Sequence, residues 1–461
     1  MFDSLFKVRI NWFVFLSIAI ILFVLFPSLS WYAYFALLIF IHQVFLLFYS
    51  LDTVIPIRYL FGVLMCMQMF LGPTLAYYGL DKFQYSYYTM KVPESRYFEY
   101  VLPAVICFIL GLHLKAGKLK GEILDTIGIK KFADAHASLP YWFIGIGFIS
   151  SIIAGFFSSD LAFVFYLLGN FKFIGAFILI LGNRQLKIIE VIVVYSSIVV
   201  SSLGAGMFHD LLTWVIMLGA VLAIKFKPGI NFKILFGIAF IIVVLIIQQV
   251  KGSYRAATAK GDAADVETFQ KVYNEEQDNN QLFSLANLAG SNVRINQGFI
   301  ITNIMRMVPS KVPFSEGEEL MQLVEAAILP RVWAPDKLRA GDRALFTKYT
   351  GLNLRSGTSM GLSSIGDAYI NFGLVGGCIF MFVLGLLYNL VLKQFHKYSK
   401  HFPILLLFVP LVFYYPIRPD CELQTILGHL VKSCFLIFVI FLVWKKEFRM
   451  NYRPFWKKYS S

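Results

Sequence analysis

Charged residues are scarce in this 461-residue sequence: Asp, Glu, Lys and Arg make up only 15% of it, whereas 58% is hydrophobic. Soluble domains carry about 25% charged and about 45–50% apolar residues, so this composition excludes a water-soluble globular protein. Intrinsic disorder is excluded as well, because disordered chains are poor in aromatic residues and 17% of these residues are aromatic. The long apolar runs instead predict a polytopic membrane protein.

Cysteine is rare, and the familiar catalytic motifs are missing. Four of the five cysteines, Cys66, Cys107, Cys378 and Cys434, lie in apolar segments, which argues against a disulfide framework. The sequence contains no P-loop and no cluster of His and Cys at metal-binding spacing. The expected outer segments also lack an Asp-x-Asp pair that could hold a divalent metal with a sugar nucleotide. We therefore expect no metal, no cofactor and a donor substrate that resides in the membrane.

Apolar runs of about 17–25 residues are each long enough to cross a bilayer as a helix. We predict an all-α polytopic membrane protein with about twelve transmembrane helices and one large outer loop. The helices are expected near residues 10–27, 29–50, 57–79, 98–114, 139–157, 161–181, 187–204, 207–225, 231–250, 367–392, 402–418 and 425–444.

The net charge of +14 comes from 41 Lys and Arg residues against 27 Asp and Glu residues. A basic soluble protein could bind nucleic acid, but basic residues are also enriched in the cytoplasmic loops of membrane proteins. With twelve spans both termini lie on one side, and the short segments on that side, such as 115–120 and 445–458, are consistently basic. The sequence therefore predicts cytoplasmic termini and no nucleic-acid partner.

One long segment, residues 251–366, remains on the outer side, with 13 Lys and Arg against 12 Asp and Glu. A structureless loop of this length would be unusual, so we expect it to be partly helical. One helix is expected over about 282–307, and another follows Ser315 and Glu318, whose spacing is typical of a capping box. The predicted parts are transmembrane helices 1–9 in 1–250, the extracytoplasmic loop in 251–366, helices 10–12 in 367–444 and a basic cytoplasmic tail in 445–461.

Arginine is frequent in this loop. Its fixed donor fork matches phosphate oxygens, so arginines above a helical bundle suit an anionic lipid headgroup. Arg255 follows the ninth span at headgroup depth, and Arg331 lies between two prolines beside Trp333, a residue type that favours the membrane interface. The alternative is that the loop arginines pair with the acidic residues of the loop on a solvated surface.

Acidic and imidazole groups near the outer ends of the spans are candidate acid–base residues, because ionisable groups within spans are costly. His209 and Asp210 open the eighth span on the side of the long loop. Asp367 follows a run rich in Gly and Ser, 351–366, which could form a nest of backbone N–H groups for an anion. Asp367 could instead only cap the tenth helix.

Four local strings give the chain a family resemblance: 251–255 (KGSYR), 294–299 (RINQGF), 330–337 (PRVWAPDK) and 365–373 (IGDAYINFG). Together with about twelve spans and one long outer loop before the last three, they resemble the O-antigen (oligosaccharide repeat-unit) polymerase family, Wzy, of the GT-C-like membrane glycosyltransferases. The architecture covers most of the chain, whereas the strings cover only about 250–380.

This resemblance implies a glycan donor on undecaprenyl diphosphate. The growing chain would pass to the terminal sugar of a second lipid-linked repeat unit on the outer face of the inner membrane. It also implies a copolymerase that regulates chain length as a partner. Without a metal, fixed cations must stabilise the leaving diphosphate. We assign that role to Arg255, Arg294 and Arg331, with Lys337 and Arg355 in support.

The acceptor hydroxyl calls for a general base within hydrogen-bonding reach. Asp367 is the first candidate and His209 the second, while Tyr369 and Asn371 are expected to shape the sugar site. The resemblance is imperfect here, because the family is expected to have Glu more often at the position of Asp367, whose carboxylate reaches less far.

Three other functions compete with a polymerase. An O-antigen ligase would share the fold and the donor, but ligases rely on a His in the outer loop, and 251–366 contains none. A lipid-linked oligosaccharide flippase or other transporter would usually show repeated halves, and no repeat is visible. A receptor or scaffold would leave the arginines unexplained.

Overall fold

The computed structural model describes residues 10–115, 123–157, 159–182, 187–279, 282–329, 341–354 and 360–449. Within these residues all regular elements are helices, as the composition predicts. Arg331, Lys337 and Arg355, which the sequence suggests as diphosphate-binding residues, lie outside the described residues.

Ten helices in the described part of the chain are long and apolar enough to cross a membrane. They are α3 (Trp31–Ser50), α4 to α5 (Ile57–Tyr77), α6 (Glu94–His113), α8 with η5 (Leu139–Phe156), α9 to α10 (Ala162–Gly182), α11 (Ile188–Ala205), α12 (His209–Phe226), α13 (Ile230–Ala259), α19 (Ser363–Ser399) and α21 (Leu423–Val443). The expected spans at 10–27 and 402–418 correspond to shorter apolar helices, α2 (Trp12–Leu25) and η6 with α20 (Pro403–Val412).

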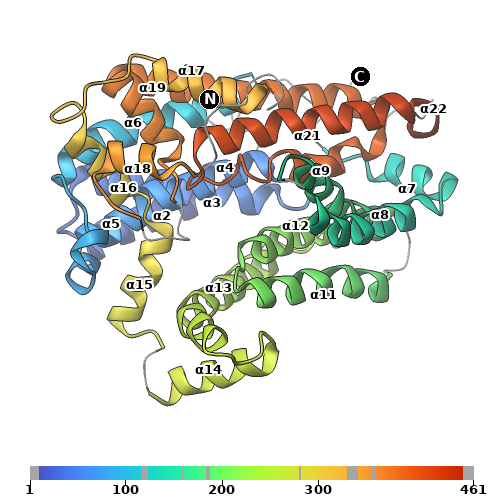
Figure 1. Ribbon diagram of the computed structural model, residues 1–461, viewed down its shortest axis with the longest axis horizontal. Coiled ribbons are helices and arrows are strands. Elements are labelled where there is room, and N and C mark those ends of the chain that lie inside the picture. Colours follow the sequence, from blue (N-terminus) through green and yellow to red (C-terminus); the bar gives the residue numbers. More distant parts are fainter. Residues whose placement is uncertain are drawn as a thin grey trace.

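The long helices form two groups in Figure 1. The upper group holds α3, α4, α6, α19 and α21, and the lower one holds α11, α12 and α13. At one end of the bundle, on the left in Figure 1, lie α15 (Leu285–Ile295), α16 (Gly298–Met307) and α18 (Arg343–Thr350). We call it the loop-bearing end. The opposite end carries α7 (Thr126–Ala135) and α22 (Lys445–Phe448).

Close contact between α6 and α19 depends on glycine. A Cβ atom at Gly111 would overlap the carbonyl oxygen of Phe382, and one at Gly385 would overlap that of Phe108. Small residues at such positions let two membrane helices approach until their backbones touch. The reciprocal arrangement fixes the register of the two helices.

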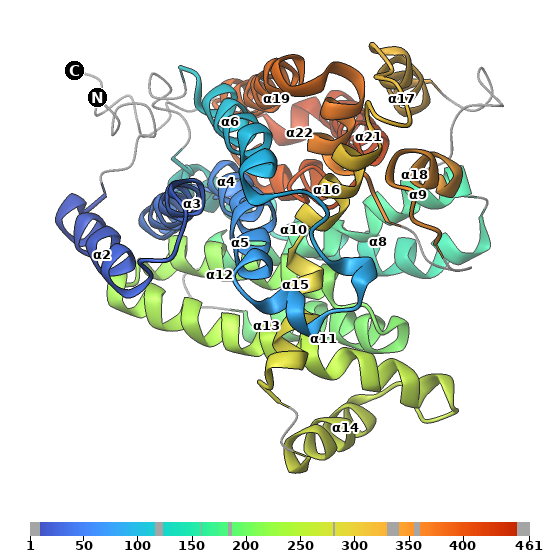
Figure 2. The same cartoon turned by 90° about the vertical axis from the view of Figure 1, so that its left-hand side faces the viewer.

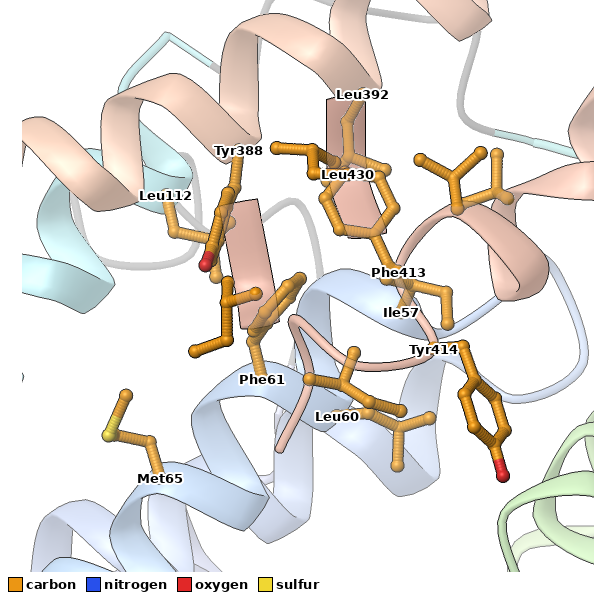
Figure 3. Packing of buried hydrophobic residues seen from close by; sticks show 14 of the residues in the cluster. Ile57, Leu60, Phe61, Met65, Leu112, Tyr388, Leu392, Phe413, Tyr414 and Leu430 are labelled. Carbon is orange, nitrogen blue, oxygen red and sulfur yellow. The ribbon is translucent and has the colours of Figure 1, made fainter. Parts of the chain in front are cut away.

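Aromatic rings fill the centre of the upper group (Figure 3). The ring of Phe61 on α4 stacks on Tyr388 of α19 with centroids 4.9 Å apart. A second contact of Phe61 is edge-on with Phe413, 5.5 Å away in the segment after α20. All three side chains are at most 2% exposed. Three chain segments that are distant in sequence therefore share one packed core.

The long loop is largely helical, but its helices differ from those expected. Instead of one helix over 282–307, α15 ends at Ile295 and α16 starts at Gly298, because the side chain of Asn296 accepts a hydrogen bond from the Gly298 amide at 2.8 Å and caps the second helix. Helix α14 (Val266–Asp278) precedes them and projects from the molecule in Figures 1 and 2.

The expected helix after Ser315 exists as α17 (Glu318–Ile328), but the predicted capping box is wrong. Its N-cap is Gly317, and the Ser315 hydroxyl donates instead to Asn371 Oδ1 at 2.8 Å. The same Asn371 oxygen accepts the Leu320 amide at 3.0 Å and so caps α17 from a different helix. A cap supplied through tertiary structure leaves no local sequence signal.

The limits of the two helices that flank the loop also differ from those expected. Helix α13 continues to Ala259 rather than ending near 250, and α19 begins at Ser363 rather than at 367. Gly373 interrupts α19 with a φ of 65°, a left-handed conformation that glycine adopts readily. The short helical segment before Gly373 carries Asp367, Tyr369 and Asn371.

Candidate functional site

A cleft of about 490 Å³ opens at the loop-bearing end, where the junction of α15 and α16 meets the segment that links α20 to α21. Its lining combines cations, carboxylates, aromatic rings and amides. The lining residues are Tyr88, Val293, Arg294, Gln297, Phe299, Ile300, Gly341, Met360, Gly361, Tyr415, Arg418, Asp420, Cys421, Glu422 and Thr425.

Arg294 reaches the cleft from the last turn of α15. This short helix is held in place by hydrogen bonds to the membrane-spanning bundle. Asn292 Nδ2 donates to the Gly72 carbonyl at 3.0 Å, and the Gln297 amide donates to the Gln68 carbonyl at 3.2 Å. The Arg294 side chain itself is exposed. The backbone around this guanidinium is therefore fixed, whereas the guanidinium is free to contact a ligand.

The linking segment supplies a second arginine. Arg418 forms an ion pair with Asp420 at 3.0 Å, and its guanidinium lies over the Tyr415 ring, 5.5 Å from the centroid. Burial raises the pKa of the Asp420 carboxyl, but the charge of Arg418 and the hydrogen bonds to the carboxylate together outweigh burial, so the net pKa is lowered. Asp420 is thus an anionic partner that orients Arg418.

Further cations gather beside the cleft at the end of α13. Lys251 lies within electrostatic range of Arg255, Arg294 and Arg418, and Arg255 within range of Arg294. Arg255 Nε donates to the Gly206 carbonyl at the C-terminus of α11, at 2.8 Å. Among the described residues, no carboxylate forms an ion pair with Lys251, Arg255 or Arg294. We call Lys251, Arg255, Arg294 and Arg418 the cation cluster.

This cluster has an electrostatic consequence. Four like charges gathered at one place repel one another, and the ion pair of Arg418 with Asp420 offsets part of this repulsion. An anion that enters the cleft relieves this repulsion, and its oxygens find guanidinium donors that are already positioned. The arrangement therefore fits a ligand with several negative charges better than a neutral one.

Glu422 supplies a carboxylate to the same cleft. One oxygen, Oε1, accepts the Gly341 amide at 2.7 Å and the Thr425 hydroxyl at 2.9 Å. Burial raises the pKa of this carboxyl and outweighs the two hydrogen bonds, which lower it. Glu422 differs from Asp420 because no cation among the described residues forms an ion pair with it.

Asp367 occupies a structural position. Its side chain is 3% exposed, and Oδ2 accepts the Leu423 amide at 3.0 Å, so the carboxylate caps α21. Tyr369 packs against Tyr100 at 4.9 Å, and Asn371 caps α17. None of these three residues lines the cleft. Asp367 supports the start of α21, which borders the site, and Asn371 supports the start of α17.

His209 lies on the surface next to a carboxylate rather than in the cleft. Its Nε2 is 2.5 Å from Asp210 Oδ1, which also accepts a hydrogen bond from the Tyr414 hydroxyl. Arg418 lies within electrostatic range of Asp210, so this group borders the cation cluster.

Sequence reasoning singled out Arg255 and Arg294 but missed Lys251, Arg418, Asp420 and Glu422. The signal for the last three was present: residues 418–422 (RPDCE) are the charged link between two apolar runs on the side of the long loop. As to metals, the described part of the chain contains no group of three or more His, Cys, Asp and Glu that could hold an ion.

The fold defines the class: a polytopic α-helical membrane protein with a long, partly helical segment, residues 260–362, between two of the helices long enough to span a membrane. The chain belongs to the family described as Domain of unknown function (DUF8712), whose profile matches residues 57–446 and so covers every residue that lines the cleft. No curated protein and no solved structure matches the chain.

Proposed function

We propose that the protein is a polysaccharide polymerase of the O-antigen polymerase (Wzy) type. It transfers a growing glycan from undecaprenyl diphosphate to the terminal sugar of a lipid-linked repeat unit on the outer face of the bacterial inner membrane. The observation that carries the proposal is the cation cluster, three members of which have no carboxylate partner among the described residues, beside a cleft of about 490 Å³.

The chemistry of the leaving group explains the cations. When the bond between the anomeric carbon and the lipid diphosphate breaks, the diphosphate gains negative charge. Fixed donors aimed at that charge stabilise the transition state more than the ground state. Arg294 and Arg418 in the cleft, with Lys251 and Arg255 beside it, would serve this purpose.

The remaining lining suits sugars. Tyr88, Phe299 and Tyr415 offer aromatic faces, and Gln297 and Thr425 offer polar groups for hydroxyls. The volume lies within the range of about 300–1,000 Å³ that is usual for small-ligand sites. A sugar bound to a diphosphate therefore has complementary surfaces for both of its parts.

Charge at the two ends of the bundle supports the proposed topology of twelve spans with both termini in the cytoplasm. At the end opposite the cleft lie α7, α22 and the last turns of α12 and α19, all of them basic. Their lysines favour the cytoplasmic side, which puts the cleft outside. These lysines are Lys130, Lys131, Lys225, Lys397, Lys445 and Lys446.

The proposal is tested by the glycolipid ladder of the native host after deletion of the gene. We expect collapse to core plus a single repeat, with rescue by the wild-type gene. Long lipid-linked polymer that never reaches its acceptor would instead identify a ligase. Repeat units retained on the inner leaflet would identify a flippase. Either of these two results would refute the polymerase.

A further inference from the structure

In the described part of the chain, four carboxylates lie in or around the cation cluster, Asp210, Asp367, Asp420 and Glu422, and the first three already have a partner that fixes their role. Asp420 is paired with Arg418 at 3.0 Å. Asp210 is shared between His209 and Tyr414. Asp367 is buried and caps α21 through the Leu423 amide.

Glu422 differs from these three. It lines the cleft, as Asp420 also does, and it stands at the N-cap position of α21. Within the described part of the chain its Oε1 is held by neutral donors alone, the Gly341 amide and the Thr425 hydroxyl. These two bonds orient the carboxylate without neutralising it. A carboxylate that is held in place and faces a cavity is what proton abstraction from a bound hydroxyl requires.

We propose that Glu422 is the general base of glycosyl transfer, the residue that contacts the acceptor sugar hydroxyl. This inference rests on the proposed function. It assigns the role to Glu422 rather than to Asp367, the carboxylate that sequence reasoning favours. Both carboxylates lie at the start of α21, but of the two only Glu422 lines the cleft.

The proposed step conserves atoms and charge. The acceptor hydroxyl oxygen attacks the anomeric carbon of the donor glycan, forming the new glycosidic bond, and its proton passes to the Glu422 carboxylate. The bond from that carbon to the diphosphate oxygen breaks, and the oxygen keeps the electron pair. The cation cluster holds the diphosphate, and Glu422 then loses its proton to water.

The surroundings of Glu422 favour a base of moderate strength. Burial raises the pKa of its carboxyl above the ordinary glutamate value, and Asp342 at the start of α18 raises it further. Arg294 and Arg418 also line the cleft, together with the anionic Asp420 and the neutral Tyr88, Tyr415 and Cys421. A general base works best when its pKa approaches the working pH, so this shift is in the useful direction.

The test compares Glu422→Gln with the wild type in nanodiscs, using undecaprenyl-diphosphate-linked repeat units as donor and acceptor. We expect kcat to fall roughly 100- to 10,000-fold, the usual contribution of a general base, with the KM for the lipid within about threefold. The matched control is Glu325→Gln, an exposed glutamate on α17, which should stay within twofold of the wild type.

A second variant provides a readout that does not depend on the folding of Glu422→Gln. The Thr425 hydroxyl lowers the pKa of Glu422, so Thr425→Ala should move the acidic limb of the pH–rate profile of kcat to higher pH. The acidic limb of the profile should also be present in Glu422→Asp, because this variant keeps a carboxyl group. A limb in Thr425→Ala that coincides with the wild-type limb would overturn the assignment.

Two further outcomes separate the proposal from its premise. If Glu422→Gln elongates glycan at a wild-type rate, or loses lipid binding in proportion to its rate, Glu422 is not the base, although the protein is still a polymerase. If the wild type itself forms no longer product, the proposed function fails, whatever the variants do.

Discussion

Removal of the Arg294 guanidinium should weaken catalysis without weakening the fold. The side chain is exposed, lines the cleft and has no carboxylate partner among the described residues. A hydrogen bond to a charged group contributes about 1.5–3 kcal/mol. Since about 1.36 kcal/mol corresponds to a factor of ten in rate, Arg294→Ala should lower kcat/KM roughly 10- to 150-fold.

The assay is elongation of undecaprenyl-diphosphate-linked repeat units by purified protein in nanodiscs, followed by mass spectrometry. Arg306→Ala is the matched control, because Arg306 is an exposed arginine of the same loop whose Nη2 bonds Asn303 Oδ1 at 2.9 Å and which does not line the cleft. It should stay within twofold of the wild type. Arg294→Lys should recover only part of the loss, since lysine keeps the charge but not the fork.

The melting temperature of Arg294→Ala shows whether its loss of activity comes from weaker catalysis or from a less stable fold. Arg294 lies within electrostatic range of Lys251 and Arg255, so its removal relieves repulsion, and the melting temperature should not fall. A wild-type rate in Arg294→Ala would refute the reasoning. So would equal losses in Arg294→Ala and Arg306→Ala.

Three more predictions concern the frame of the site. Asp367→Ala leaves the Leu423 amide without its acceptor, which should cost about 1–3 kcal/mol in unfolding free energy and lower the melting temperature; an unchanged melting temperature would contradict this. Gly111→Leu forces a side chain into the backbone of α19, so little folded protein should elute as a single peak on size exclusion, whereas a wild-type profile would show that the helices can separate. The lowered pKa of Asp420 means that its pair with Arg418 stabilises the fold above the unfolded carboxyl pKa and that this contribution is lost as pH falls through the folded value. Melting temperature should therefore depend on acidic pH less in Asp420→Asn than in the wild type, and parallel curves would disprove it.

Length and apolarity made the helical, polytopic fold predictable from the sequence. Helices in lipid satisfy their own backbone hydrogen bonds, so an apolar run of sufficient length specifies its structure almost alone. The residues at which helices begin and end were harder to predict, because they depend on contacts with other parts of the chain. Asn371 caps α17 and Asp367 caps α21, and neither contact is visible in the local sequence.

Of the candidate site, only part of the set of cationic residues could be predicted from the sequence. Arg255 stood out because it lies just beyond a span, and Arg294 because of the family resemblance of the string 294–299. The structure places both near Lys251. Which acid faces the cleft could not be read from the chain, since Asp367 and Glu422 both precede apolar helices. Only the fold shows that Asp367 faces the packed interior and Glu422 the cleft.

The most direct test of the central claim is the product of purified wild-type protein in nanodiscs supplied only with undecaprenyl-diphosphate-linked repeat units. We predict a series of lipid-linked glycans that differ by one repeat, with one undecaprenyl diphosphate released for each repeat added. Recovery of the starting lipid alone, with the protein folded and the lipid bound, would contradict it.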